Sequence, residues 1–219
     1  MGYTRDWTKE ELVDIILHRR GEDTNYRRSY LELRKHPLMK NNKETLRAMA
    51  QKELERNRIE GFYGGKFLPM HKGHLFCIDT AAKQCDHVVV IMFINGDDEL
   101  RVLKNDNGND KTLCLEYRIE QLSRVCSLYD NVDFAVIDVL RLKLPDGSED
   151  WDAETPLVRE YVPKMDYVYS SEPKYGEYFS RAYPEAKHII VDANRGTYPI
   201  SSTMIRAMKT LEDKEQWLV

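Results

Sequence analysis

Residues 88–94 read Val-Val-Val-Ile-Met-Phe-Ile, an unbroken apolar run that follows His87. The run has the length of a strand and falls well short of the ~18 apolar residues of a membrane span. A strand with one face in water alternates polar and apolar residues, whereas a continuously apolar strand is buried on both faces. Such strands are typical of parallel sheets with helices on both sides. The run therefore predicts a layered α/β fold.

The rest of the chain after residue 58 alternates between short apolar segments and helical patterns. We predict strands over residues 59–67, 87–94, 131–139, 166–170 and 187–192. We predict helices over residues 74–84, 113–129, 151–161, 177–183 and 201–211. This alternation predicts a doubly wound, mostly parallel, Rossmann-like sheet with helices on both faces. Ligands of such sheets bind beyond the carboxyl ends of the strands.

Residues 1–58 have helical patterns and no strand signal, so we predict a helical N-terminal extension before a second domain over residues 59–219. Thr8 and Glu11 have the spacing of a capping box, which starts a helix that Gly21 can end. A second helix is predicted over residues 26–36 and a third over residues 43–58. The sequence from Met1 has no signal-peptide pattern, which predicts a cytoplasmic protein without membrane association.

Charge and cysteine content exclude several classes of protein. Residues 61–219 carry 26 acidic and 19 basic side chains, which argues against nonspecific binding of nucleic acid. The four cysteines have no spacing typical of zinc ligands. We predict buried free thiols, no nucleic-acid partner and no protein-bound metal.

The first motif with chemical content is the sequence of residues 64–74, Gly-Gly-Lys-Phe-Leu-Pro-Met-His-Lys-Gly-His. Glycines at the end of the first predicted strand let a ligand approach the backbone. His71 and His74 are three residues apart where a helix begins, so both rings can face one ligand near the positive helix end. Lys66 adds a positive charge, which makes the turn a candidate phosphate site.

The second motif lies at residues 195–206, Arg-Gly-Thr-Tyr-Pro-Ile-Ser-Ser-Thr-Met-Ile-Arg. Ser201, Ser202 and Thr203 are favoured helix N-cap types. Their hydroxyls and the free N–H groups of the first turn predict an anion site. Arg206, one turn further on, can reach the same anion.

Together the two motifs resemble the nucleotidyltransferase superfamily, with its His-x-Gly-His turn and Ile-Ser-Ser/Gly-Thr-x-Ile-Arg helix start. Within it, the sequence is most similar to the adenylyltransferase domain of the bifunctional nicotinamide mononucleotide (NMN) adenylyltransferase/ribosylnicotinamide kinase. Residues 65–74 reproduce that domain's Gly-Lys-Phe-x-Pro-x-His-x-Gly-His turn. Residues 166–172, Asp-Tyr-Val-Tyr-Ser-Ser-Glu, and residues 191–195, Val-Asp-Ala-Asn-Arg, resemble two further segments. The resemblance covers residues 61–210.

The resemblance implies roles for individual residues. It implies catalytic roles for Lys66, His71, His74 and Arg206. Trp151 resembles the tryptophan that stacks on the pyridine ring of NMN; the alternative is a half-buried tryptophan that anchors a helix. The remaining residues implied to bind substrate include Asn95 and Asp97 near the ribose and Ser170 and Ser171 on the adenine side. The others are Gly64, Gly65, Phe67, Arg118, Asp192, Arg195, Ser201, Ser202 and Thr203.

The implied reaction joins ATP and NMN to give NAD and pyrophosphate, with Mg²⁺ entering on ATP. Two alternatives stay open. One is an enzyme with the same motifs and another acceptor, such as nicotinate mononucleotide, phosphopantetheine or a phosphoalcohol. The other is a catalytically silent nucleotide-binding sensor.

Two departures from the family limit the prediction. The kinase loop Gly-x-x-x-x-Gly-Lys-Ser/Thr is absent from the sequence, so we expect a transferase without that kinase. Residues 1–58 lack the turn glycine of a helix-turn-helix repressor. We expect these helices to form a lid, a dimerisation arm or a surface for a partner rather than to bind DNA.

Overall fold

The computed structural model describes residues 7–19, 36–56, 58–94, 96–105 and 110–219. The chain divides into two compact units, residues 1–58 and 59–219. No helix among the described residues is both long enough and apolar enough to span a membrane.

The first unit contains α1 (Lys9–Arg19), the 3₁₀ helix η1 (Pro37–Lys40) and α3 (Lys43–Arg56). The predicted capping box is confirmed, because Thr8 N donates to Glu11 Oε2 over 2.7 Å and Glu11 N donates to Thr8 Oγ1 over 3.2 Å. Apolar residues of α1 and α3 bury one another in a small core of their own. The helix predicted over residues 26–36 lies, except for its last residue, outside the described residues.

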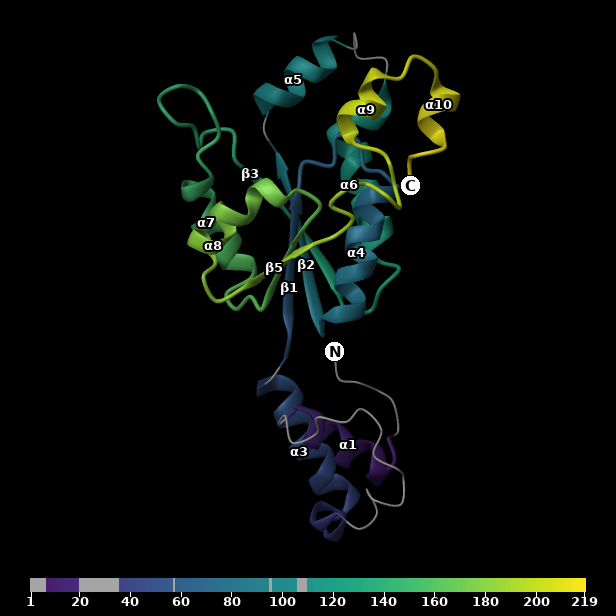
Figure 1. The fold of residues 1–219 in the computed structure, drawn as a ribbon, viewed down its shortest axis with the longest axis vertical. Coiled ribbons are helices and arrows are strands. Elements are labelled where there is room, and N and C mark those ends of the chain that lie inside the picture. Colours follow the sequence, from purple (N-terminus) through teal and green to yellow (C-terminus); the bar gives the residue numbers. More distant parts are fainter. Residues whose placement is uncertain (1–6, 20–35, 57, 95, 106–109) are drawn as a thin grey trace. The chain divides into compact units, whose positions relative to one another are not determined.

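The second unit is built on a five-stranded, all-parallel sheet in the order β3-β2-β1-β4-β5 (Figure 1). The predicted Rossmann-like topology is confirmed. Because β1 has β2 on one side and β4 on the other, strand order reverses at β1, and ligands are expected beyond its carboxyl end. The strands are β1 (Glu60–Gly65), β2 (His87–Ile94), β3 (Val132–Asp138), β4 (Tyr167–Ser170) and β5 (Lys187–Ile190).

Helices cover both faces of this sheet. Figure 1 shows α4 (Lys72–Gln84) and α6 (Leu115–Cys126) on one side and α7 (Trp151–Tyr161) and α8 (Gly176–Ala182) on the other. Alternate residues of β2 enter two separate cores: Val88 and Val90 pack with α4 and α6, and Val89 and Ile91 pack with α7 and α8. Burial on both faces therefore explains the unbroken apolar run of this strand.

The remaining elements are helices, and they correct the sequence prediction in two places. The single helix predicted over residues 201–211 is two helices, α9 (Ser202–Ala207) and α10 (Leu211–Glu215), because Thr210 caps a new helix by accepting from Asp213 N over 3.1 Å. An unpredicted helix, α5 (Gly96–Asn105), begins where the ribose-binding residues were expected. Two 3₁₀ helices complete the unit, η2 (Lys111–Leu113) and η3 (Pro173–Tyr175).

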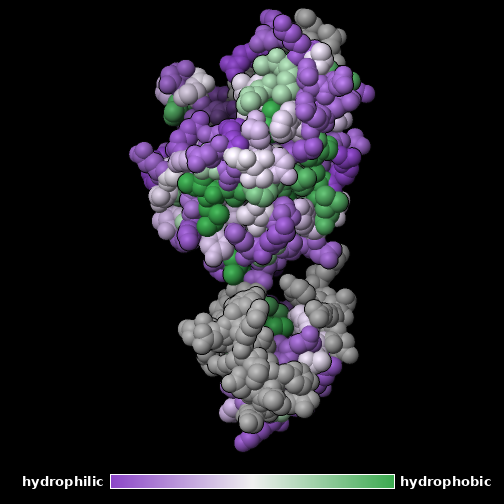
Figure 2. Space-filling model, turned by 45° about the vertical axis from the view of Figure 1, so that its right-hand side comes forward, coloured by the Kyte–Doolittle hydropathy of each residue, from purple (hydrophilic) through white to green (hydrophobic). Residues whose placement is uncertain are grey.

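Among the described residues, the cysteines and the exposed apolar side chains carry no evident site. The four cysteines are free; Cys114 is half-buried and the other three are buried, as predicted. On the face shown in Figure 2, apolar side chains gather in separate areas between hydrophilic ones. Isolated exposed apolar residues are normal for globular proteins and indicate no particular partner. Those most exposed are Leu128, Leu211, Tyr161 and Met204.

Candidate active site

The turn after β1 places the first motif at the carboxyl edge of the sheet. Gly64 is required there for space, since a β-carbon at this position would lie 2.7 Å from Cε2 of Phe93. Phe67 has a φ of 47°, a conformation that side-chain-bearing residues adopt rarely and at some energetic cost. Its ring is 1% exposed and packs edge-on against Tyr63 and His74. Packing of this ring offsets the cost of the backbone conformation.

Arg118 supports this turn from behind through buried hydrogen bonds. Its guanidinium donates to the backbone oxygens of Lys66 over 2.6 Å and Phe67 over 3.2 Å, and to the Glu99 carboxylate over 2.5 Å. The residue is 1% exposed and does not line the cavity described below. Buried partners thus occupy the donors of the guanidinium, and the expected contact of Arg118 with substrate stays a prediction.

His71 and His74 form a capping box at the start of α4. His71 Nδ1 accepts from Gly73 N over 3.1 Å, and His74 Nδ1 accepts from His71 N over 3.3 Å. The two rings stack, with centroids 3.7 Å apart and 24° between their planes. Because each Nδ1 is an acceptor, the proton of each neutral ring is on Nε2. The capping contacts therefore fix which nitrogen can donate to a ligand.

Both rings are neutral at physiological pH. Burial, reinforced by the positive charge of Arg195, lowers the pKa of His71 to about 4. Burial lowers the pKa of His74 well below its usual range, with smaller contributions from His71 and Arg195. Two neutral N–H donors are thus held side by side without the need to order either ring when a ligand arrives.

The second motif packs directly on the first. Ser201 caps α9 by accepting from Met204 N over 3.2 Å, as expected for this residue type. Ser202 Oγ donates to the backbone oxygen of Pro69 over 3.0 Å, and the Arg206 guanidinium donates to the backbone oxygen of Leu68 and to Thr203 Oγ1. The two motifs, some 130 residues apart in the sequence, therefore form one wall.

Asp192 and Arg195 shape the loop that leads into α9. The Asp192 carboxylate accepts from Thr197 N over 3.0 Å and Tyr198 N over 2.9 Å, and these bonds lower its pKa. Arg195 donates to the backbone oxygen of Ile200 over 2.6 Å and pairs with Glu172. Its charge lies close enough to influence both histidines. Both residues line the cavity and also hold its wall in place.

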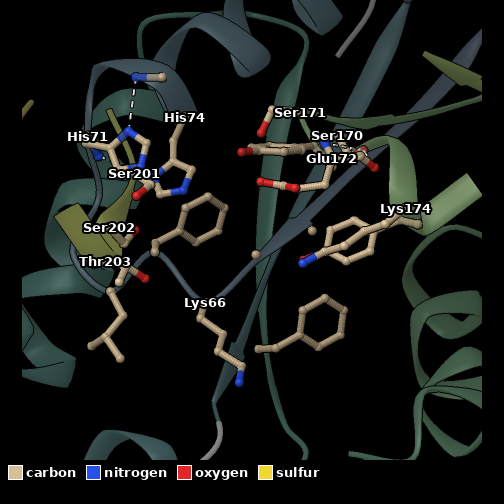
Figure 3. Close-up of a pocket in the computed structure, with 18 of the residues that line it drawn as sticks. Lys66, His71, His74, Ser170, Ser171, Glu172, Lys174, Ser201, Ser202 and Thr203 are labelled. Atoms are coloured by element: carbon tan, nitrogen blue, oxygen red, sulfur yellow. Dashed lines mark hydrogen bonds between the residues drawn. The ribbon is translucent and has the colours of Figure 1, made fainter. Parts of the chain in front are cut away.

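The two motifs line a cavity of about 540 Å³, large enough for a nucleotide-sized ligand. Figure 3 shows His71, His74 and Ser201–Thr203 on one side of it, and Ser171, Glu172 and Lys174 across from them. The structure brings together fifteen of the predicted site residues on its lining: Gly64, Gly65, Lys66, Phe67, His71, His74, Trp151, Ser170, Ser171, Asp192, Arg195, Ser201, Ser202, Thr203 and Arg206.

Three predicted residues are not among those lining the cavity. Arg118 lies behind the turn, as described above. Asn95 falls outside the described residues, and of Asp97 only the backbone, in the first turn of α5, is described.

Sequence reasoning missed a second group of lining residues. Lys66 pairs with Glu149, and Glu149 Oε2 accepts from Trp151 Nε1 over 3.2 Å. The indole meets Tyr175 and Tyr178 edge-on, with ring centroids 5.2 and 5.1 Å away. Glu149 precedes α7, Tyr175 ends η3 and Tyr178 lies on α8. These residues share no motif, so no signal in the sequence marked them. They give the cavity an aromatic and acidic end, distinct from the basic wall near α9.

Ser170 occupies the end of β4 and is held in place by a neighbouring strand. Its hydroxyl lies 2.7 Å from His188 Nε2 and donates to the backbone oxygen of Glu172 over 3.2 Å. Burial lowers the pKa of His188. The hydroxyl therefore has partners already, and its contribution to a ligand site is mainly the shape of this end of the cavity.

The parallel sheet with its ligand cavity at the switch point, and the paired histidine and serine-threonine motifs around it, define a Rossmann-like nucleotidyltransferase. Residues 62–208 match the family described as Cytidylyltransferase-like, and the chain belongs to that family.

Comparisons with individual proteins give distant relatives. The chain is 25% identical, over 155 residues, to the trifunctional NAD biosynthesis/regulator protein NadR of Escherichia coli strain K12; the match covers 67% of this chain and 36% of that protein. Two crystal structures of NadR, one with NAD and AMP-PNP and one with NR, share the fold, each with a TM-score of 0.52 and 21% identity. These matches cover 73% and 74% of this chain and 44% and 43% of those chains. The chain thus spans less than half of each of these proteins.

Proposed function

We propose that this protein is an adenylyltransferase that joins ATP and nicotinamide mononucleotide to give NAD and pyrophosphate. The observation that carries the proposal is the division of one cavity into two ends. Neutral N–H donors and cationic side chains lie at the end formed by the two motifs, and an aromatic cluster around Trp151 lies at the other. Phosphates suit the first end, and a cationic pyridine ring suits the second.

The reaction needs positioning and charge neutralisation more than proton transfer. A phosphate oxygen of NMN attacks the α-phosphorus of ATP, a new O–P bond forms, and the bond to the β-phosphate oxygen breaks to release pyrophosphate. The second pKa of the attacking phosphate is near 6, so it is largely ionised at pH 7 and needs no strong base. His71 and His74 donate from Nε2 to phosphate oxygens as charge builds there.

Lys66 and Arg206 hold the triphosphate in this scheme. In the structure Lys66 is paired with Glu149, and Arg206 donates to backbone and hydroxyl oxygens. A polyphosphate carries more negative charge than either set of partners, so we expect Lys66 to exchange its carboxylate for phosphate oxygens on binding.

Magnesium fits the site as a companion of ATP. The described residues contain no cluster of three or more histidine, cysteine, aspartate or glutamate side chains able to hold a metal ion. Mg²⁺ retains several waters and is commonly held by substrate phosphates, where it neutralises charge. Lys66 and Arg206 would flank the phosphates that carry it.

Pyrophosphate release, measured with ATP and NMN together and with each alone, tests the proposal. We expect release only with both, and a dinucleotide as the second product. Nicotinate mononucleotide, phosphopantetheine and a phosphoalcohol replace NMN in parallel assays. Pyrophosphate release with phosphopantetheine alone, or with the phosphoalcohol alone, would assign a different transferase. ATP binding without release from any acceptor would indicate the sensor.

Replacing Arg206 by lysine tests the phosphate end. Lysine keeps the charge but loses the planar fork that makes paired hydrogen bonds. We expect ATP and pyrophosphate each to bind about tenfold more weakly, in line with the ~1.5 kcal/mol or more of a hydrogen bond to a charged group. Calorimetric titration measures both affinities, and circular dichroism checks folding. Arg124→Lys, an exposed change on α6, serves as the control. Unchanged affinity for both ligands would make Arg206 a structural residue only.

Replacing Trp151 by alanine tests the acceptor end. If the indole stacks on the pyridine ring, NMN binding should weaken by ~0.5–2 kcal/mol while ATP binding stays nearly constant. Tyr161→Ala, which removes a half-exposed ring at the far end of the same helix, is the matched control. Titration of each ligand into each variant gives the comparison. Equal weakening of both ligands would mean that Trp151 only anchors α7 against Tyr175 and Tyr178.

A further inference from the structure

The acidic end of the cavity contains a carboxyl group that the proposed chemistry does not use. Glu154 lies on α7, lines the cavity and is 8% exposed. It follows Trp151 by three residues on the same helix, so the two side chains share one face, with β-carbons about 5–6 Å apart. A ring that stacks on the indole would therefore lie beside the helix face that carries this carboxyl.

The neighbours of Glu154 do not neutralise it fully. Glu149 and Asp150 add negative charge from the preceding loop, and Lys66 and Lys143 add positive charge. Lys66 is already paired with Glu149, whose other oxygen accepts from the Trp151 indole. Burial raises the pKa of the Tyr178 hydroxyl, on α8, which is also close enough to Glu154 for the charge of Glu154 to raise that pKa further. Among the described residues, none donates a hydrogen bond to the Glu154 carboxyl.

A buried carboxyl beside another carboxylate holds its proton more tightly than one in water. Burial first, and then the charge of Glu149, raises the pKa of Glu154 to about 7. The group is therefore half ionised at neutral pH. The two histidines stay neutral over the same range, since the pKa of His71 is about 4 and that of His74 is also lowered. Glu154 is thus a lining group whose charge changes between pH 6 and pH 8.

We propose that Glu154 selects the acceptor ring, accepting a hydrogen bond from a carboxamide substituent and repelling a carboxylate substituent. This inference rests on the proposed function. An ionised carboxyl can accept from the amide N–H₂ of NMN but faces like charge in nicotinate mononucleotide. A protonated carboxyl donates to either substituent. The enzyme would then discriminate between amide and acid only while Glu154 is ionised.

The ratio of kcat/KM for NMN to kcat/KM for nicotinate mononucleotide, measured from pH 6 to pH 8, tests this selection. Both acceptors carry the same phosphate and react with the same ATP, so their common ionisations cancel in the ratio. With a pKa of about 7, the protonated fraction of Glu154 falls about tenfold over this interval. We expect the ratio to rise by about the same factor in the wild-type protein.

Glu154→Gln removes the charge and keeps the size of the side chain. The ratio in this variant should be independent of pH, and its use of nicotinate mononucleotide at pH 8 should exceed that of the wild type. Glu160→Gln, an exposed change on the same helix, is the matched control and should follow the wild-type profile.

Three results would overturn the selection by Glu154. They are a constant ratio in the wild type, a ratio that falls with pH, and an unchanged pH profile in Glu154→Gln. If Glu154→Gln does not fold, the pH dependence of the kcat/KM ratio in the wild-type protein is sufficient to test the selection. Formation of NAD with a constant ratio overturns only this inference, whereas no dinucleotide from either acceptor overturns the proposed function as well.

Discussion

Replacing His74 by alanine should lower turnover by ~10²–10³-fold, the usual loss when one donor to the transition state is removed. His71→Ala should lose a similar factor. The physical reason is that both rings are neutral, His71 buried and His74 half-buried, with each Nδ1 accepting from a backbone N–H and each Nε2 left to donate. Pyrophosphate release at saturating ATP and NMN measures the change.

His71→Asn separates donation from capping. Asparagine is a favoured N-cap residue, so it can accept from Gly73 N in place of His71 Nδ1. It has no atom at the position of Nε2, the donor. We therefore expect this variant to unfold at the same temperature as the wild type and still to lose turnover. Activity within about twofold of the wild type would mean that His71 only caps α4.

Replacing Arg118 by methionine should destabilise the second unit by ~3–5 kcal/mol. The substitution leaves the Glu99 carboxylate without its buried partner, and breaking a buried pair from one side typically costs this much. It also removes the donors to the backbone oxygens of Lys66 and Phe67. Urea denaturation followed by circular dichroism measures the free energy of unfolding.

A second substitution distinguishes the charge from the packing. Arg118→Met combined with Glu99→Met leaves no unpaired charge, so it should recover much of the lost stability. Arg124→Met, an exposed change on the same helix, should alter stability by less than about 0.5 kcal/mol. If Arg118 bound substrate, Arg118→Met would weaken ATP or NMN binding without changing the free energy of unfolding.

The fold could be predicted because its signals are local. The apolar run of β2, the alternation of strands and helices, and the capping pattern at Thr8 each depend on residues close together in the sequence. The two motifs were also recognisable, since each follows a strand and begins a helix within about a dozen residues. Their convergence on one cavity followed from the rule that parallel strands present their carboxyl ends at one edge.

The parts that sequence reasoning missed depend on contacts between distant segments. An arginine on an amphipathic helix has the same local pattern whether it faces a ligand or a buried glutamate, and Arg118 faces Glu99. The break between α9 and α10 depends on Thr210, which caps the start of α10. The sequence pattern alone is equally compatible with one continuous helix. Glu149 and Glu154 carry no motif of their own, and their place in the site depends on the turn after β1, which brings Lys66 to Glu149.

The origin of the two cavity walls has a consequence for how such an enzyme can diversify. The phosphate-facing groups come from the turn after β1 and the loop before α9. Trp151 and the two glutamates come from a single crossover between β3 and β4. If the proposed roles hold, sequence changes confined to that crossover would alter what is recognised and leave the reacting centre intact. A lineage could therefore exchange its acceptor by remodelling one stretch of chain, with the bond-forming apparatus inherited unchanged.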